Sequence, residues 1–286
     1  MRLYMNVISE NLSHEKKDSH LNLVEDYFNK HSRYWSDVYF HPKNIHDFIL
    51  INRNNIAVKF LCSYLSPGNT ILDAGCGAGV TMLSLIVKGF FVHGIDISPK
   101  MLDLCQQNLS HHGIDPGHYQ LTQTDLYKAN LPRQSFDGIV ALGFLQYQPD
   151  EFTALKALQS LLKPGGILVL SGPTKIKLTE YFGLAKLYYS IKNRRARFKN
   201  NSDIAVLHKI SSHYYSVRRF KRLLKRTNFE MLDFKGHGFV NFAIIKDWTS
   251  RGQYFLHRFF TGVSKFLPIQ RFANDLVVVA RKSGEE

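Results

Sequence analysis

The sequence predicts an α/β protein built on an open, mostly parallel sheet. A short apolar strand ends at Asp73, runs into a loop with three glycines (75–79), and leads to an apolar helix at 80–87. Short apolar runs then alternate with amphipathic segments as far as residue 173, which is typical of parallel strands joined by helical crossovers. The length, 286 residues, allows one large domain with appendages and a full core.

Five strands are expected within this alternation, and two more after it. They are 71–73, 91–95, 119–122, 136–142 and 167–170, followed by 229–234 and 276–280. Helices are expected at 80–87, after the N-cap Ser98 with Pro99 at its first position, and at 149–162. The run Lys-Pro-Gly-Gly at 163–166 ends the last of these helices.

The regions on either side of the alternation differ from it in composition. Residues 1–20 are polar and are expected to be loosely held. The expected units are a tail and helical cap (1–66), a core (67–173), a basic helical insert (174–213) and a C-terminal part of the core (214–286). Within them we expect an aromatic-rich stretch at 27–39, helices at 45–65, 181–199 and 216–226, and an aromatic-rich insert at 236–273.

The glycine loop also indicates the kind of ligand. A dinucleotide fingerprint would place its third glycine at position 80, where this chain has Val80. The carboxylate of Asp73 would repel a pyrophosphate but attract a cationic amine. S-adenosylmethionine carries an ammonium and a sulfonium and no phosphate, so charge favours it over NAD. Taken alone, the glycines could also form a plain tight turn.

Composition argues against several classes of protein. The three scattered cysteines, Cys62, Cys76 and Cys105, do not suggest a disulfide framework or a zinc site. The 13 histidines show no metal-ligand spacing. No segment resembles a signal peptide or approaches the roughly 20 apolar residues of a membrane span. We therefore expect a cytoplasmic protein that needs no metal.

The net charge of +14 is concentrated in one part of the chain. Residues 174–228 contain 15 Lys and Arg against 2 Asp and Glu. This concentration predicts an anionic partner, which could be a membrane surface to which the protein binds peripherally. A solvated helix face without a partner is the alternative.

Five segments, in their order and spacing, resemble the class I S-adenosylmethionine-dependent methyltransferases. They are LDAGCGAG (72–79), GIDISPKML (94–102), TDL (124–126), SFDGIVALGFLQYQPD (135–150) and LLKPGGILVL (161–170). The aromatic segment 27–39, followed by a helix with Arg53, is similar to the subgroup that includes ubiquinone/menaquinone and magnesium-protoporphyrin methyltransferases. The resemblance implies a Rossmann-like sheet of seven strands in the order 3-2-1-4-5-7-6, with the last strand antiparallel.

The resemblance also implies which residues bind S-adenosylmethionine and its product, S-adenosylhomocysteine. Asp73 would lie near the ammonium and Asp96 would accept both ribose hydroxyls. Asp125 would take the adenine amino group, although an ordinary N-cap is a serious alternative for it. The other implied contacts are Gly75, Cys76, Gly77, Gly79, Ile97, Met101, Leu126, Leu142, Gly143, Tyr27, Tyr34 and Arg53.

Such an enzyme aligns an acceptor atom with the activated methyl group and excludes water. A hydroxyl or a carbon acid would also need a general base, for which the candidates are His208, His213, Tyr147, Tyr214 and Tyr215. The aromatic and aliphatic inserts favour O- or C-methylation of a small lipophilic metabolite.

Two other functions are compatible with the sequence. The first is an RNA methyltransferase that uses the basic face of 174–228. It is less favoured, because the chain lacks the Asn/Asp-Pro-Pro-aromatic motif that relatives methylating exocyclic amines of bases often use. The second is a non-catalytic partner subunit that binds S-adenosylmethionine. The chain also has Gln146 and Tyr147 where many relatives have a histidine-rich segment.

Overall fold

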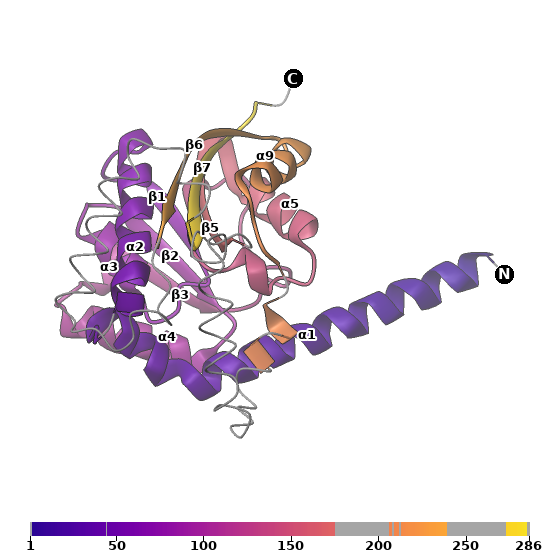
Figure 1. Ribbon diagram of the computed structural model, residues 1–286, viewed down its shortest axis with the longest axis horizontal. Coiled ribbons are helices and arrows are strands. Elements are labelled where there is room, and N and C mark those ends of the chain that lie inside the picture. The colour runs from indigo at the N-terminus through magenta and orange to yellow at the C-terminus, as the bar shows by residue number, and fades with distance from the viewer. Residues whose placement is uncertain are drawn as a thin grey trace, which may run out of the picture.

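A central sheet of seven strands is covered by helices on both faces (Figure 1). The computed structural model of the chain describes residues 2–43, 45–174, 206–207, 209–211, 213–238 and 273–284, and the side chains of these residues except 2–14 and 45. The helix expected at 181–199 and most of the insert expected at 236–273 lie outside the described residues.

The strands follow the order β3-β2-β1-β4-β5-β7-β6. Neighbours among the first five are parallel, whereas β7 runs antiparallel to both β5 and β6. This confirms the sheet that the resemblance implied. The strands are β1 (Thr70–Ala74), β2 (Phe91–Asp96), β3 (Tyr119–Gln123), β4 (Phe136–Ala141), β5 (Leu162–Pro173), β6 (Phe229–His237) and β7 (Asp275–Lys282).

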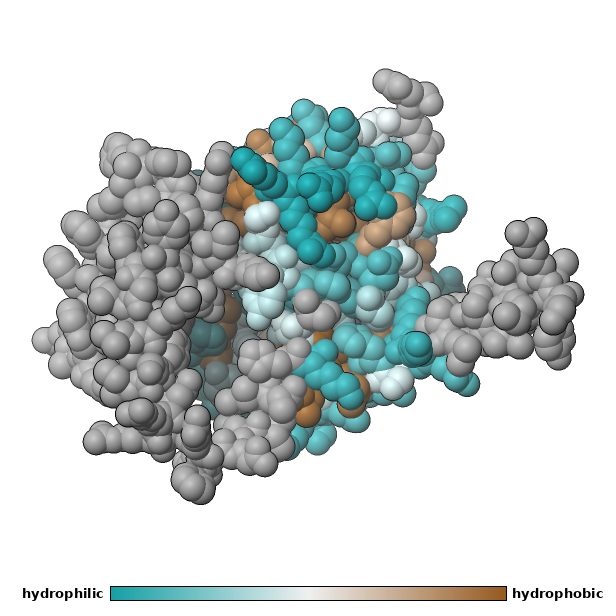
Figure 2. Space-filling model, turned by 45° about the vertical axis from the view of Figure 1, so that its right-hand side comes forward, coloured by the Kyte–Doolittle hydropathy of each residue, from teal (hydrophilic) through white to brown (hydrophobic). Residues whose placement is uncertain are grey.

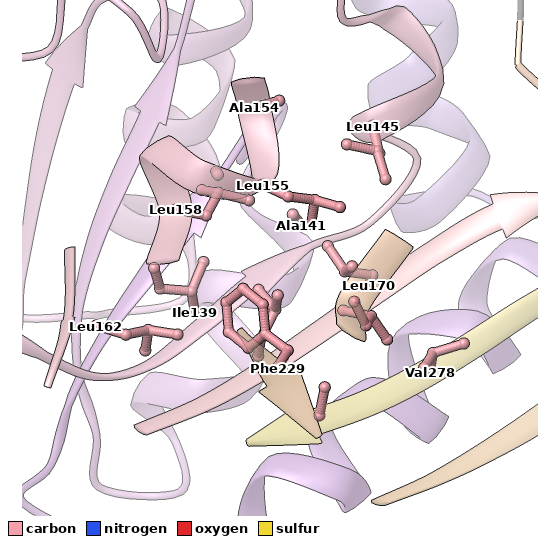
Figure 3. Packing of buried hydrophobic residues seen from close by; sticks show 14 of the residues in the cluster. Ile139, Ala141, Leu145, Ala154, Leu155, Leu158, Leu162, Leu170, Phe229 and Val278 are labelled. Atoms are coloured by element: carbon pink, nitrogen blue, oxygen red, sulfur yellow. The ribbon is translucent and has the colours of Figure 1, made fainter. Parts of the chain in front are cut away.

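Alternating strand residues divide the core into two layers. Helices α2 (Ile45–Tyr64), α3 (Val80–Ile86) and α4 (Pro99–His111) bury their apolar sides on one face of the sheet. Helices α5 (Glu151–Leu161) and α9 (Val217–Arg226) cover the other face. Figure 3 shows Leu155 and Leu158 of α5 packed near Ile139 and Leu170 of the sheet. Strands buried on both faces account for their nearly continuous apolar sequences.

Polar side chains set where these helices begin. Ser98 accepts a hydrogen bond from the Met101 amide at the start of α4 (3.1 Å), and Pro99 occupies the first turn. Asp150 caps α5 through the Thr153 amide (2.7 Å), and Ser216 caps α9 through Arg219.

Strand β5 begins earlier than the sequence predicts, because Leu162 already pairs with Phe136 across an irregularity in the ladder.

Helix α1 (Arg2–Phe40) is longer than the sequence predicts. Residues 2–20, expected to be loosely held, form its first part, and this part extends away from the sheet (Figure 1). Propagating a helix is easier than nucleating one, so the docked second part supports this extension. The backbone leaves helical geometry at His31 (φ −107°, ψ 15°), and beyond it α1 lies along α4.

Gly172 provides a test of how tightly α9 packs on the sheet. Its backbone lies against the ring of Tyr215, which stacks on Phe220 of α9 with ring centroids 4.4 Å apart. Both rings are buried, so a methyl group at position 172 would overlap Tyr215. We expect Gly172→Ala to lower the free energy of unfolding by about 1–3 kcal/mol, the usual cost of overpacking.

Urea denaturation followed by circular dichroism measures this change. Gly284→Ala is the control, because a Cβ there would meet nothing within 4 Å. An unchanged midpoint for Gly172→Ala would mean that the Tyr215 ring moves aside at little cost.

Candidate functional site

A cavity of about 450 Å³ lies at the carboxyl ends of the parallel strands. The segments that follow β1, β2, β3 and β4 form one part of its wall. Side chains of α1 and α2, the residues before α9 and the first residue of β7 form the rest. Open α/β sheets bind their ligands at this edge.

The loop after β1 depends on glycine for its close packing. Gly75 and Gly79 have φ of 74° and 86°, which side-chain-bearing residues rarely adopt. A Cβ at Gly75 would lie 2.8 Å from the Phe144 ring, and one at Gly79 would lie 2.6 Å from Cys105 Sγ. The loop therefore lies close to both the segment after β4 and helix α4.

Asp96 joins this loop to the end of β2. Its Oδ2 accepts a hydrogen bond from the Gly77 amide (2.9 Å), and its Oδ1 accepts one from the Ser98 amide (2.9 Å). Burial raises the pKa of this carboxyl despite these hydrogen bonds. A carboxylate has about four acceptor positions, so this one retains capacity for donors in the cavity that it lines.

Asp73, in β1, is almost completely buried, and its Oδ2 has no hydrogen-bond partner among the described residues. Burial raises its pKa to about 8, and the nearby charge of Asp96 adds to the effect. A carboxyl in this position gains most from a cationic ligand, because the cation replaces the hydration that burial removes.

Arg53 brings the opposite charge into the same cavity from α2. Its Nη2 donates to the Tyr39 hydroxyl (2.7 Å), and its Nη1 lies 3.6 Å from Asp275 Oδ2. Its Nε is buried without a partner among the described residues. Asp73 and Arg53 thus offer an unpartnered acceptor and an unpartnered donor, which suits a ligand group that carries an ammonium and a carboxylate together.

Most of the other expected cofactor residues also line the cavity. They are Cys76, Ile97, Met101, Asp125, Leu126, Leu142 and Gly143. Asp125 is in addition a local cap, since its Oδ1 accepts from the amides of Tyr127 (2.8 Å) and Lys128 (3.0 Å). Gly79, Tyr27 and Tyr34 are not among the described residues of the lining. Tyr27 packs on Phe28 and His31, and Tyr34 is 54% exposed.

The structure separates the candidate bases. Tyr147 and Tyr214 line the cavity, and burial raises the pKa of Tyr147 to about 12. Tyr215 lies outside the lining in the core, and its pKa is likewise raised by burial. His213 Nδ1 lies 3.8 Å from Glu151 Oε2 and is not among the described lining residues. His208 lies outside the described residues.

The sequence reasoning missed several residues of the cavity. One side of α2 lines it through His46, Ile49 and Leu50 together with Arg53, which was predicted, and their i, i+3, i+4, i+7 spacing could have identified this face. Asp275 had no local signal beyond its place before an apolar strand. Other missed lining residues include Phe28, Trp35, Tyr39, Thr174 and Asn274.

The sequence matches the profile of the methyltransferase domain family over residues 65–228, more than half of the chain. The chain belongs to the class I S-adenosylmethionine-dependent methyltransferases. This match confirms the family that the sequence motifs resembled. It also includes the glycine loop, Asp96 and α9 within one domain.

Three proteins show the range of similarity. The methyltransferase is 29% identical over 147 residues to a ubiquinone biosynthesis O-methyltransferase of Chromobacterium violaceum, covering 51% of this chain and 60% of that protein. It superposes on magnesium protoporphyrin IX methyltransferase of Synechocystis with bound S-adenosylmethionine (TM-score 0.60, 17% identity, 92% of this chain and 97% of that one). A 1,6-didemethyltoxoflavin-N1-methyltransferase of Burkholderia thailandensis gives a TM-score of 0.58 at 15% identity, over 93% and 90% of the two chains.

The sequence matches and the structural matches support different conclusions about this chain. The chain spans about half the length of the curated relatives it matches, from 45% to 62% in four of them. The structural matches share the fold at an identity too low to indicate a common acceptor.

The described part of the basic segment includes α9. All six of its Lys and Arg residues are exposed, while Phe220, Leu223 and Leu224 are buried in the core. Arg219 pairs with Glu151, and Arg226 lies 5.1 Å from the ring centre of Phe152. In the described part of the chain, Arg218, Lys221, Arg222 and Lys225 form no ion pair. The described surface seen in Figure 2 is mostly hydrophilic, with smaller hydrophobic patches.

The described residues lack two kinds of feature. None of the described helices is both long and apolar enough to cross a membrane. No group of three or more His, Cys, Asp and Glu side chains within this part of the chain is placed to hold a metal ion. The expectations about metal and cellular location stay predictions.

The raised pKa of Asp73 predicts a pH-dependent cost in stability. Between its ordinary value of 3.8 and about 8, the folded state holds a proton that the unfolded state has lost. Raising the pH through this window therefore destabilises the cofactor-free protein, by at most about 1.4 kcal/mol per pH unit. Asp73→Asn removes the ionisation, so its stability advantage over the wild type should grow with pH and level off above about pH 8.

Urea midpoints of the cofactor-free proteins at several pH values test this. Asp103→Asn is the control, because Asp103 is an exposed residue of α4. Its urea midpoint should change with pH as that of the wild type does. Parallel profiles for wild type and Asp73→Asn would contradict the buried, protonated carboxyl.

Proposed function

We propose that this chain transfers a methyl group from S-adenosylmethionine to an oxygen or carbon atom of a small, largely apolar acceptor. The observation that supports this most is the cavity itself. Asp73 Oδ2 and Arg53 Nε have no hydrogen-bond partner among the described residues, and Asp96 lies at the end of the neighbouring strand. These groups match the polar parts of the cofactor in kind.

The fit of the cofactor follows from the chemistry of its parts. Asp73 would pair with the ammonium, and the guanidinium of Arg53 with the carboxylate. Asp96, held by two backbone amides, would accept the ribose hydroxyls. Asp125 would accept from the adenine amino group, with Ile97, Met101 and Leu126 offering apolar contacts to the ring.

When bound, S-adenosylmethionine supplies a methyl group already activated by a sulfonium. The protein's part is then to position the acceptor and exclude water. Helices α1 and α2 contribute Phe28, Trp35, Ile49 and Leu50 to the wall opposite the strand ends. These side chains give the cavity the low polarity that keeps water away from the reacting atoms.

The acceptor is inferred from the lining residues not assigned to the cofactor. Ile49, Leu50, Pro173 and Tyr214 supply apolar surface among them. The name of the Chromobacterium relative specifies O-methylation in ubiquinone biosynthesis. An apolar ring compound is consistent with that name and with the lining.

One observation favours an anionic macromolecule as partner. The four unpaired basic residues of α9 occupy one exposed face. Because the apolar side of α9 is already buried in the core, this helix would bind phosphate groups by charge alone and would not insert into a bilayer. The face could serve RNA as substrate or bring the enzyme to an anionic membrane.

Label partition tests the proposal. The purified full chain is incubated with methyl-labelled S-adenosylmethionine and host lysate, and organic extract, RNA, protein and aqueous metabolites are separated. We expect label in the organic extract. Label in RNA would replace the small acceptor by a nucleic acid. Cofactor binding without label in any fraction would favour a non-catalytic partner subunit.

Asp96 offers a quantitative test of the cofactor site. Removing a carboxylate that accepts two hydroxyl groups should weaken binding by about 100-fold or more, since each hydrogen bond to a charged group contributes roughly 1.5–3 kcal/mol. We expect this for Asp96→Ala in titration calorimetry with S-adenosylhomocysteine. Asp103→Ala removes an exposed carboxylate of α4 and should bind normally. Retained affinity in Asp96→Ala would refute the ribose assignment.

A further inference from the structure

Four carboxylates line the cavity among the described residues. Asp73, Asp96 and Asp125 belong to β1, β2 and the segment after β3, which are neighbours at one end of the strand order. The fourth, Asp275, is the first residue of β7, toward the other end of the strand order. There it pairs with Pro173 of β5 and His237 of β6.

The cofactor accounts for three of these carboxylates. Three polar groups of the cofactor donate hydrogen bonds, namely the ammonium, the ribose diol and the adenine amino group. The carboxylate of the cofactor only accepts them. These correspond to Asp73, Asp96 and Asp125, which leaves Asp275 without a partner in the cofactor. An ionised carboxylate can only accept hydrogen bonds, so any ligand group it receives must be a donor.

Asp275 is held ready for such a donor. Its Oδ1 accepts the Leu276 amide (2.9 Å), while Arg53 Nη1 and His237 Nε2 lie 3.6 Å and 3.5 Å from its Oδ2. His237 is 1% exposed and lies behind the carboxylate, outside the described lining. These neighbours hold the pKa of Asp275 below its ordinary value although burial opposes them, so it stays ionised.

Aliphatic surface also borders this carboxylate, beside Arg53 and His237. Gly238, next to His237, fits between Ile49 of α2 and Asn274, because a Cβ there would lie 3.1 Å from Ile49 Cγ2 and 3.4 Å from Asn274 Cβ. Ile49 therefore borders the same end of the cavity as Asp275. A ligand at this end meets the carboxylate of Asp275, the guanidinium of Arg53 beside it and the aliphatic side chain of Ile49.

We propose that Oδ2 of Asp275 binds the hydroxyl group of the methyl acceptor and takes its proton. The acceptor is then a hydroxylated, otherwise apolar compound such as a phenol, and the reaction is O-methylation. This inference rests on the proposed methyl transfer and adds the acceptor class and its base. His237 and Arg53 act as positioning residues for the carboxylate.

The step balances in atoms and charge. The acceptor oxygen forms a bond to the methyl carbon, the carbon–sulfur bond breaks with its electron pair staying on sulfur, and the O–H bond breaks with its proton moving to Asp275. Bond formation to the methyl group makes the hydroxyl proton strongly acidic, so even a weakly basic carboxylate suffices to accept it. The proton then leaves to water.

A pair of probes tests the acceptor class without relying on activity. Hexylcatechol and its dimethyl ether have similar apolar bodies, but only the catechol can donate hydrogen bonds. Both are titrated into the full chain saturated with S-adenosylhomocysteine. The wild type should bind the catechol at least about 10-fold more tightly, the factor expected for a hydrogen bond to a buried charge.

Two variants assign that preference to one residue. Asp275→Asn should bring the two affinities within about 3-fold of each other, because the amide is a weaker acceptor than a carboxylate. Asp233→Asn is the matched control, since Asp233 is an exposed residue of β6 whose Oδ1 also accepts the next amide (2.7 Å). It should keep the wild-type preference. Equal affinities in the wild type, or a preference that survives Asp275→Asn, would overturn the proposal.

Two further readouts separate this inference from the proposed function. Asp275→Asn should keep its affinity for S-adenosylhomocysteine, and a wild type that fails to bind it would instead refute the proposed function. Any labelled product in the organic extract should release its label as methyl iodide in hot hydriodic acid, which cleaves methyl ethers. Label that resists this treatment would place the methyl group on carbon or nitrogen and overturn the inference.

Discussion

The carboxylate of Asp96 connects the elements on which the candidate site depends. It accepts the Gly77 amide from the loop after β1 and the Ser98 amide from the start of α4. Ser98 Oγ then donates to Asn29 Oδ1 of α1 (2.7 Å). Asp96 and Ser98 thus join the ends of β1 and β2, the glycine loop, and helices α4 and α1. Backbone donors fix the acid, so its orientation does not depend on flexible side chains.

The same cavity contains two polar groups that the described residues leave without a partner. The raised pKa of Asp73 and the unpartnered Nε of Arg53 are costs of folding in the absence of ligand. A ligand that supplies both opposite charges would recover much of this cost on binding. Binding of the cofactor should therefore stabilise the fold by more than simple surface burial provides.

The sequence was most informative where function and fold depend on local chain geometry. The sequence pattern could be recognised where residues contact others nearby in the chain. This holds for the glycine loop, for Asp96 at the end of β2, and for Ser98 and Pro99 at the start of α4. Arg53 and Asp275 meet across 222 residues of chain, and no local pattern predicts such a contact. Tyr34 and Trp35 show the same limit, because the direction in which α1 docks decides which of the two borders the cavity.

The antiparallel direction of β7 has a consequence for how this protein could diversify. The parallel strands end at the cavity, but β7 begins there, directly beside the end of β6. The chain therefore departs after Gly238 and returns at Ala273 at the same border of the cavity. Insertions, deletions or recombination between these two points would change the neighbourhood of Asp275 and leave the residues around Asp96 as they are. Evolution could thus exchange acceptor preference as a module while inheriting the cofactor half unchanged.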